Sequence, residues 1–182
     1  MGVEMKLSFF CLCLLLLICM TAPGFAATYS VSLPCTGYYS PGASQVVNVN
    51  FHQTFASISS VRIAWSGDIF SSMLDVGGGW MPLPGQFRST LPSATAQTGY
   101  MDNQSFNLTT TFQGGGSWAF LLDGQSTLTM YFDENQGDYP GHGDLATASL
   151  LLDGTLVPEP SALMCLGMGL AGCVPFLRRK RR

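Results

Sequence analysis

Apolar side chains repeatedly occupy every second position between residues 27 and 156. One face of each alternating segment consists of Tyr29, Val31 and Leu33; Val47, Val49 and Phe51; Val61, Ile63 and Trp65; Phe106, Leu108, Thr110 and Phe112; Trp118, Phe120 and Leu122; and Leu128, Met130 and Phe132. Because successive side chains of a strand point to opposite faces of a sheet, this period predicts strands with one buried face. Residues 145–152 are more continuously apolar, which predicts a central strand. No part of the stretch has the period of an amphipathic helix, so the predicted class is all-β.

The number of these segments predicts the architecture. About seven to nine strands fit one antiparallel β-sandwich with a jelly-roll-like topology, and a β-barrel is the alternative. Asp123-Gly124 and Asp153-Gly154 predict tight hairpins, because an Asx-Gly pair adopts the positive φ that such turns need. The strands that these pairs would join are residues 117–122 and 126–132 in the first hairpin, and residues 150–152 and 155–157 in the second.

The N-terminal segment has the pattern of a secretory signal. Lys6 precedes a long, almost unbroken apolar run, which predicts a signal helix. Gly24 and Ala26 supply the small side chains required at the −3 and −1 positions. Cleavage is therefore predicted between Ala26 and Ala27, and the signal peptide covers residues 1–26.

The C-terminal segment has three features in a fixed order. Val157-Pro158-Glu159-Pro160 cannot be helical throughout, because each proline fixes φ and restrains the residue before it. Residues 161–177 carry no charge and reach the lower length limit of a transmembrane helix. The basic cluster Arg178-Arg179-Lys180-Arg181-Arg182 would stop transfer and remain in the cytoplasm. Lys6 lies on the same side of the membrane in the precursor, so the residues between the two ends are predicted to be translocated.

This C-terminal arrangement resembles the PEP-CTERM sorting signal, a tail also named the ice-binding protein C-terminal domain. The resemblance covers residues 157–182 and implies an exopolysaccharide-producing Gram-negative bacterium. It implies an exosortase, an integral-membrane transpeptidase-like enzyme, that recognises Pro158, Glu159 and Pro160 and processes the chain near them. The basic cluster at residues 178–182 is then a retention signal. The resemblance assigns no activity to residues 27–156.

The two ends together predict a route for the protein. Its partners are the Sec export machinery and the exosortase. Its precursor spans the inner membrane once, with the N-terminus outside after signal cleavage, and the protein then reaches the cell surface or the extracellular space. The predicted domains are the signal peptide, the β-sandwich ectodomain at residues 27–156 and the sorting signal at residues 157–182.

Charge is distributed unevenly along the chain. Between Ala27 and Pro160 the basic residues are Arg62 and Arg88, and against them stand ten acidic residues, which leaves a net charge of −8. Nucleic acid is excluded as a partner, because its recognition requires basic patches. An acidic surface remains compatible with cations and with neutral sugars.

Cysteines are also sorted by segment. Five lie in the two apolar end segments: Cys11, Cys13, Cys19, Cys165 and Cys173. Only Cys35 lies in the predicted ectodomain, so no internal disulfide stabilises it. Cys35 is interpreted as a small packing residue, and the alternatives are a reactive thiol and an intermolecular disulfide.

No catalytic residue is predicted. The ectodomain lacks the Gly-x-Ser-x-Gly, His-Glu-x-x-His and Cys-x-x-Cys motifs, and His52 and His142 are isolated. The leading interpretation is a non-enzymatic structural or interaction protein of the cell surface or extracellular matrix, linked to exopolysaccharide. A secreted hydrolase that uses an unrecognised pair of carboxylates is one alternative.

Two binding functions are further alternatives, and no other cofactor is predicted. A weak calcium site would use Asp133, Asn135, Asp138 and Asp144, because Ca²⁺ prefers clustered oxygen ligands; the other interpretation of this segment is a solvated loop. A carbohydrate-binding module would use aromatic rings in loop-like segments, where they can stack on a pyranose. These rings are Tyr38, Tyr39, Trp80, Tyr100 and Tyr139.

Overall fold

A computed structural model describes residues 26–114, 116–134 and 140–157 of the chain. The predicted signal helix, the predicted transmembrane helix and the basic cluster all lie outside these residues. Residues 26–157 belong to one compact unit. Of the described residues, 69% lie in strands and 2% in helix, which confirms the all-β class.

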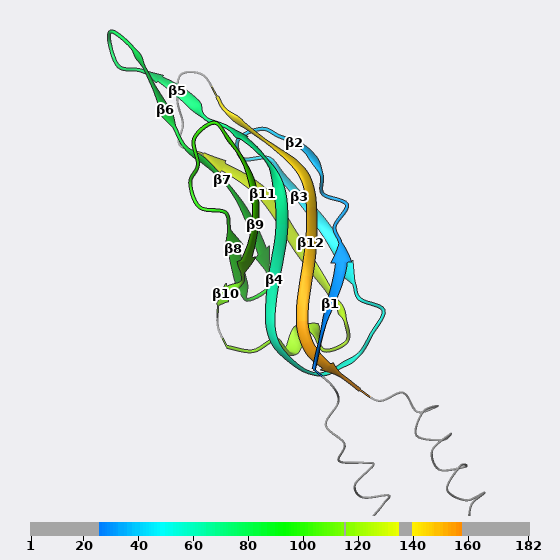
Figure 1. Ribbon diagram of the computed structural model, residues 1–182. Coiled ribbons are helices and arrows are strands. Elements are labelled where there is room, and N and C mark those ends of the chain that lie inside the picture. The colour runs from blue at the N-terminus through cyan, green and yellow to red at the C-terminus, as the bar shows by residue number, and fades with distance from the viewer. Residues whose placement is uncertain (1–25, 115, 135–139, 158–182) are drawn as a thin grey trace, which may run out of the picture. The chain divides into compact units, whose positions relative to one another are not determined.

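Two antiparallel sheets and one ribbon make up this unit (Figure 1). Sheet A has the order β1 (Ala27–Ser32), β12 (His142–Leu156), β4 (Phe55–Phe70) and β9 (Gln104–Thr111), with β2 (Gly37–Tyr39) also paired to β12. Sheet B has the order β10 (Gln113–Gly114), β8 (Ala94–Gln97), β7 (Gly85–Leu91), β11 (Gln125–Glu134) and β3 (Ser44–Asn50). The ribbon joins β5 (Ser72–Asp75) to β6 (Trp80–Leu83).

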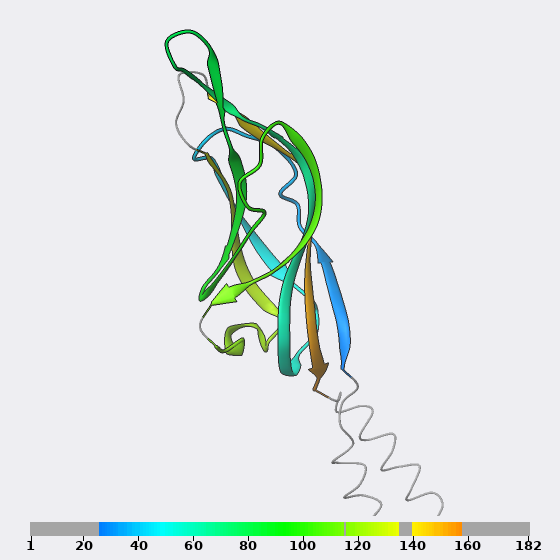
Figure 2. The ribbon, with the colours of Figure 1, turned by 60° about the vertical axis from the view of Figure 1, so that its left-hand side comes forward.

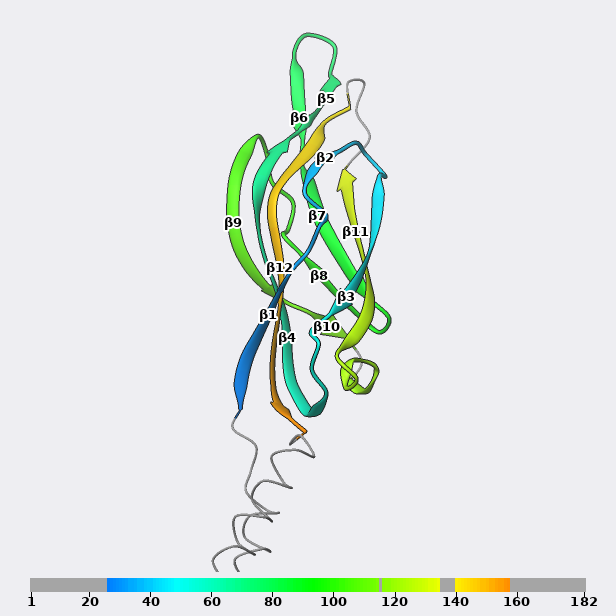
Figure 3. The same ribbon diagram turned by 90° about the vertical axis from the view of Figure 1, so that its right-hand side faces the viewer.

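The strand order is that of a jelly roll. If β1 and β2 are counted as one strand, the eight principal strands fall into two four-stranded sheets, β1/β2-β12-β4-β9 and β3-β11-β7-β8. In Figure 3, β4, β9 and β12 lie in one layer, and β3 and β11 lie in the other. The chain passes between the sheets at β3, β4, β7, β9, β11 and β12, which gives the two interlocked Greek keys of this fold. Neither sheet closes into a barrel, so the predicted sandwich is confirmed.

The sandwich core lies between the two sheets. Strand β4 shows how the sequence pattern produces it: Val61, Ile63 and Trp65 are almost completely buried and alternate with partly exposed residues. From sheet B, Phe87 packs its ring against Phe132 at 5.2 Å between centroids. Because both sheets present their apolar face inward, their burial supplies the main stabilising free energy.

Strand β12 is central, as its apolar run predicts. It pairs with β1 and β2 on one side and with β4 on the other. The hairpin predicted at Asp153-Gly154 is wrong, because β12 continues through both residues to Leu156. A register shift between Asp153 and Gly154 marks a β-bulge, and a bulge absorbs an extra residue without ending a strand.

The hairpin predicted at Asp123-Gly124 is also wrong. The segment before it contains a short 3-10 helix, Ala119–Leu121, whose Leu121 is buried in the core. Gly124 has a φ of +74°, and a Cβ there would lie 1.9 Å from the carbonyl oxygen of Gln53. The turn is therefore real, but it leads from the 3-10 helix into β11, whose partners are β3 and β7.

Cys35 is a fully buried packing residue. Burial raises the pKa of its thiol to about 11, so the reactive thiolate is scarce at neutral pH. We predict that Cys35 in the folded protein reacts with iodoacetamide at pH 7.5 far more slowly than in urea. Peptide mass spectrometry of alkylated residue 35 measures both rates, and equal rates would contradict the buried position.

Candidate functional site

Three aromatic side chains stack on the outer face of sheet A. We call Tyr38 of β2, His142 of β12 and Phe70 of β4 the distal ring cluster. The His142 ring lies 4.4 Å from the Phe70 ring, with 20° between their planes. It lies 4.9 Å from the Tyr38 ring, with 30° between their planes. Since β12 runs between β2 and β4, His142 is the middle ring of the stack.

Strand register explains why these rings meet. His142 is the direct partner of Phe70 across β12 and β4, so their side chains share one face of the sheet. Tyr38 pairs with Asp144, two positions further along β12 and on the same face as His142. The side chains of Tyr38 and Phe70 remain exposed, at 67% and 44% of their area.

Two carboxylates adjoin the rings on this outer face. Asp144 of β12 lies directly opposite Asp68 of β4. The hydroxyl of Ser105 on β9 donates a hydrogen bond to Asp68 at 2.5 Å. Aromatic faces beside hydrogen-bonding oxygens are what a site for a hydroxylated ligand requires.

The rest of the outer face of sheet A is rich in small hydroxyl side chains. Ser66 and Thr147 share a hydrogen bond of 2.7 Å, and Ser57 and Thr155 share one of 2.8 Å. Others along β1, β9 and β12 are Thr28, Ser30, Ser32, Thr109 and Ser149. This face therefore offers polar groups to a ligand and adds little to the core.

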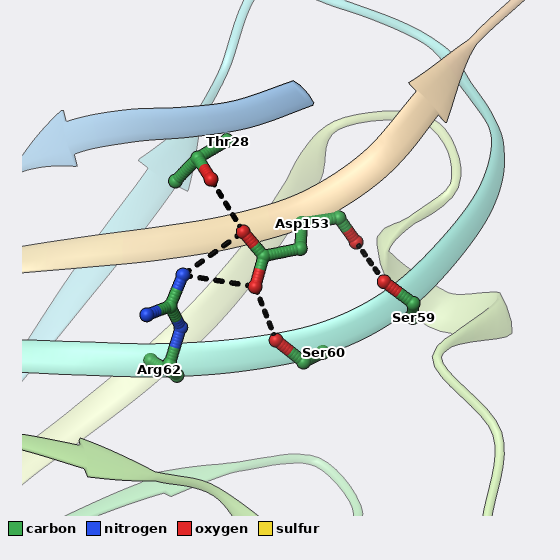
Figure 4. Close-up of polar contacts among 5 residues, drawn as sticks. All are labelled: Thr28, Ser59, Ser60, Arg62 and Asp153. Carbon is green, nitrogen blue, oxygen red and sulfur yellow. Dashed lines mark hydrogen bonds and ion pairs between the residues drawn. The ribbon is translucent and has the colours of Figure 1, made fainter. Parts of the chain in front are cut away.

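A polar network joins three strands near the last residues of β12 (Figure 4). The carboxylate of Asp153 accepts hydrogen bonds from Thr28 on β1 at 2.6 Å and from Ser60 on β4 at 2.5 Å. One terminal nitrogen of Arg62 contacts both carboxylate oxygens at 2.9 Å. Ser59 donates to the backbone carbonyl of Asp153 at 3.1 Å. The network fixes β1 and β4 to the bulge in β12.

The carboxyl of Asp153 has a lowered pKa. The main causes are the hydrogen bonds from Ser60 and Thr28, and Arg62 adds to them. Because the folded-state pKa lies below the unfolded value of about 4, this carboxylate stabilises the fold above that pH. The stabilisation is lost as the pH falls through the folded-state pKa.

We predict that Asp153→Asn lowers the free energy of unfolding by about 1 kcal/mol at pH 7. The deficit relative to wild type should shrink as the pH falls from about 4 through the lowered folded-state pKa, because Asp153 then becomes protonated and is uncharged, as asparagine is. Urea denaturation at several pH values measures this. A deficit that stays constant down to pH 2 would show that the charge of Asp153 does not stabilise the fold.

The rings predicted for sugar binding divide into two groups. Tyr38, Trp80 and Tyr100 are exposed at 67%, 51% and 52%. Tyr39 is buried instead, and its hydroxyl donates a hydrogen bond to the Cys35 carbonyl oxygen at 2.7 Å, with the side-chain oxygen of Gln45 as a second acceptor at 3.0 Å. Its hydroxyl is satisfied inside the fold, so Tyr39 is no ligand platform. Tyr139 lies outside the described residues.

Two members of the distal ring cluster were missed by sequence analysis. Phe70 follows the apolar run of β4 and has the pattern of a core residue, yet it occupies an outward position. His142 has no chemically suggestive neighbour in the sequence. Only the register between β12 and β4 brings the two rings together.

The structure does not bring the described calcium candidates together. Asp133 lies on the outer face of sheet B, where Gln86 contacts it at 3.2 Å and Arg88 at 3.4 Å. Asp144 lies on the outer face of sheet A. Asn135 and Asp138 lie outside the described residues. Within residues 26–114, 116–134 and 140–157, no three His, Cys, Asp or Glu side chains are grouped to hold a metal ion. The calcium site remains a prediction.

The last strand leads directly into the C-terminal motif. β12 ends at Leu156, and the backbone N–H of Val157 donates to the carbonyl of Thr54 at 2.9 Å. Residues 156–182 match the model of the PEP-CTERM protein-sorting motif. The chain carries a PEP-CTERM sorting signal. No curated protein and no solved structure matched this chain.

The PEP-CTERM motif implies a route for the protein. It indicates membrane transit, exosortase processing, and sorting to the cell surface or the extracellular space. The predicted recognition residues Pro158, Glu159 and Pro160 and the predicted retention signal at residues 178–182 lie outside the described residues, and of residues 157–182 only Val157 is described. No helix among the described residues has the length and apolar content to span a membrane.

Proposed function

We propose that residues 27–156 form a non-enzymatic ectodomain that acts as a structural or interaction module in an exopolysaccharide matrix. In this proposal the precursor crosses the inner membrane once, with Arg178 to Arg182 in the cytoplasm. Exosortase then separates the ectodomain from its membrane segment near Pro158-Glu159-Pro160.

One observation carries this proposal: both predicted cuts flank the sandwich without interrupting it. Ala27, the first residue after the predicted signal cleavage, is the first residue of β1. It pairs with Gly154 near the end of β12, so the two ends of the ectodomain lie side by side. Processing at either end therefore leaves both sheets whole, and the sandwich retains its own core after release.

The placement of the carboxylates supports binding over hydrolysis. Asp68 and Asp144 form a cross-strand pair, but they lie on an outer sheet face beside exposed side chains. A glycosidase carboxyl acts in an enclosed site that raises its pKa. Asp153 has the opposite perturbation, a pKa lowered by its hydrogen-bond donors.

The test is fractionation of an exopolysaccharide-producing host that expresses this chain. We expect mature protein to sediment with the matrix in the producer and to remain free in the medium of a polysaccharide-negative mutant. Reducing ends of the polymer should not increase on incubation with the protein. The same distribution in both hosts would contradict the interaction role, and new reducing ends would favour the hydrolase alternative.

A further inference from the structure

We propose that the distal ring cluster, with Asp68 and Asp144, is a binding site for a neutral polysaccharide. This inference rests on the proposed function and identifies where and what the ectodomain binds. It depends on the exposure of the rings, the oxygens beside them, the charge around them and their position in the fold.

The stacked rings leave two aromatic faces available. His142 is the middle ring, so one face of Tyr38 and one face of Phe70 point away from the stack. Tyr38 is 67% exposed and Phe70 is 44% exposed. Apolar ring faces held open to water and fixed by a partner ring need little reorganisation to bind. The C–H face of a pyranose is the complementary surface, because it is apolar while its hydroxyls project around the ring.

Hydrogen-bond acceptors lie where the sugar hydroxyls would project. Asp144 lies directly opposite Tyr38 on the neighbouring strand and opposite Asp68 on the other side. Within the described part of the chain, no side chain donates a hydrogen bond to Asp144, whereas Asp68 accepts one from Ser105. Carboxylates accept strong hydrogen bonds from hydroxyl groups and have no donor to give in return. The site therefore suits a ligand that is rich in O–H donors.

Charge selects a neutral polymer over an acidic one. The described residues contain two arginines and no lysine, and both arginines are paired: Arg62 with Asp153 at 2.9 Å and Arg88 with Asp133 at 3.4 Å. A uronate or phosphate group at the distal ring cluster would face Asp68 and Asp144 and repel both. A neutral polysaccharide meets no such repulsion.

The position of the cluster also fits a surface receptor. His142 is the first residue of β12, and Leu156, next to the sorting signal, is the last. At about 3.3 Å per residue, the strand separates the rings from the point of tail attachment by about 45 Å. The β5–β6 ribbon begins two residues after Phe70 and extends beyond the two sheets (Figure 2), and it carries exposed Val76, Trp80 and Met81. Exposed apolar side chains that gather in one region of a protein surface are typical of an interaction site.

The test uses mature protein secreted by its host and the host's exopolysaccharide, separated by anion exchange into neutral and acidic fractions. Affinity electrophoresis in gels that contain each fraction gives the dissociation constants. We expect binding to the neutral fraction, weakened about tenfold by Tyr38→Ala or Phe70→Ala through loss of a stacking surface. Asp144→Asn should weaken it less, because the amide keeps one acceptor oxygen.

Val46→Ala is the matched control. Val46 is an exposed apolar residue of β3 in sheet B, at 63%, and its removal should leave binding unchanged. Equal melting temperatures of the variants show that the fold is intact. The site is wrong if both ring variants bind as wild type does, if the protein binds only the acidic fraction, or if it binds neither. If the protein associates with the matrix but the ring variants bind as wild type does, the proposed site is wrong and the proposed function is still supported.

Discussion

Replacing Gly67 with alanine is expected to destabilise the ectodomain strongly. Gly67 lies in β4 opposite an irregular point of β12, where the register shifts between Leu145 and Thr147. A Cβ at residue 67 would lie 2.1 Å from the carbonyl oxygen of Asp144 and 3.0 Å from the Cα of Leu145. Both contacts are backbone atoms of the central strand, which side-chain rotation cannot move away.

The expected cost is at least about 3 kcal/mol, because the two central strands must separate or shift register. That is a large share of the stability of a small domain. Urea denaturation followed by tryptophan fluorescence measures it, since Trp65 is buried in the same strand.

Gly79→Ala is the matched control for this substitution. Gly79 precedes β6, and a Cβ there would meet nothing within 4 Å. The free energy of unfolding of the Gly79→Ala variant should stay within about 0.5 kcal/mol of the wild-type value. Equal effects of Gly67→Ala and Gly79→Ala would show that β4 and β12 are not packed as described.

The second large effect is expected at the sorting signal. Deletion of residues 178–182 removes the predicted cytoplasmic retention signal. We expect the precursor that lacks these residues not to be processed by exosortase. Glu159→Ala should block recognition, so that uncleaved chain accumulates in the inner membrane. Membrane fractionation and immunoblotting of the host measure both effects as loss of the mature surface form.

Replacing each arginine of the basic cluster with lysine is the control for the deletion. It keeps the positive charge that sets membrane orientation and should leave sorting intact. If Glu159→Ala and the deletion both release mature protein at the wild-type level, the tail acts as an anchor only.

Sequence patterns predicted the β-sandwich because its main determinant is local. The alternation of Val61, Ile63 and Trp65 is visible in the sequence, and the same residues are buried in the core. The continuous apolar run of residues 145–152 likewise predicted a central strand, and β12 is one. The sorting signal was readable for the same reason, since its three features follow one another along the chain.

The errors arose where pairing over long sequence separations decides the structure. Asp153-Gly154 has the local preference of a hairpin turn, yet pairing with β1 and β4 on both sides keeps it in an extended, bulged strand. Residues 118–122 alternate like a strand, but the turn at Gly124 and the packing of Leu121 produce a 3-10 helix. Local preferences are weak compared with these tertiary contacts.

The candidate site was less predictable than the fold. Tyr38, Phe70 and His142 come from three strands and share a site only through the register of β12 with its two neighbours. Tyr39 shows the converse: it is adjacent to Tyr38 in sequence, but the alternation of strand side chains turns it into the core. Which aromatic residues face outward therefore required the observed strand bounds.

We propose that the ectodomain is exported and that the chain is cut on both sides of it. Intact-mass spectrometry of the mature protein from an exosortase-containing host tests it most directly. We expect an N-terminus at Ala27 and a C-terminus within residues 157–160, so that the mature protein contains the whole jelly roll from β1 to β12. A surface protein that retains residues 161–182, or one cut within residues 27–156, would contradict it.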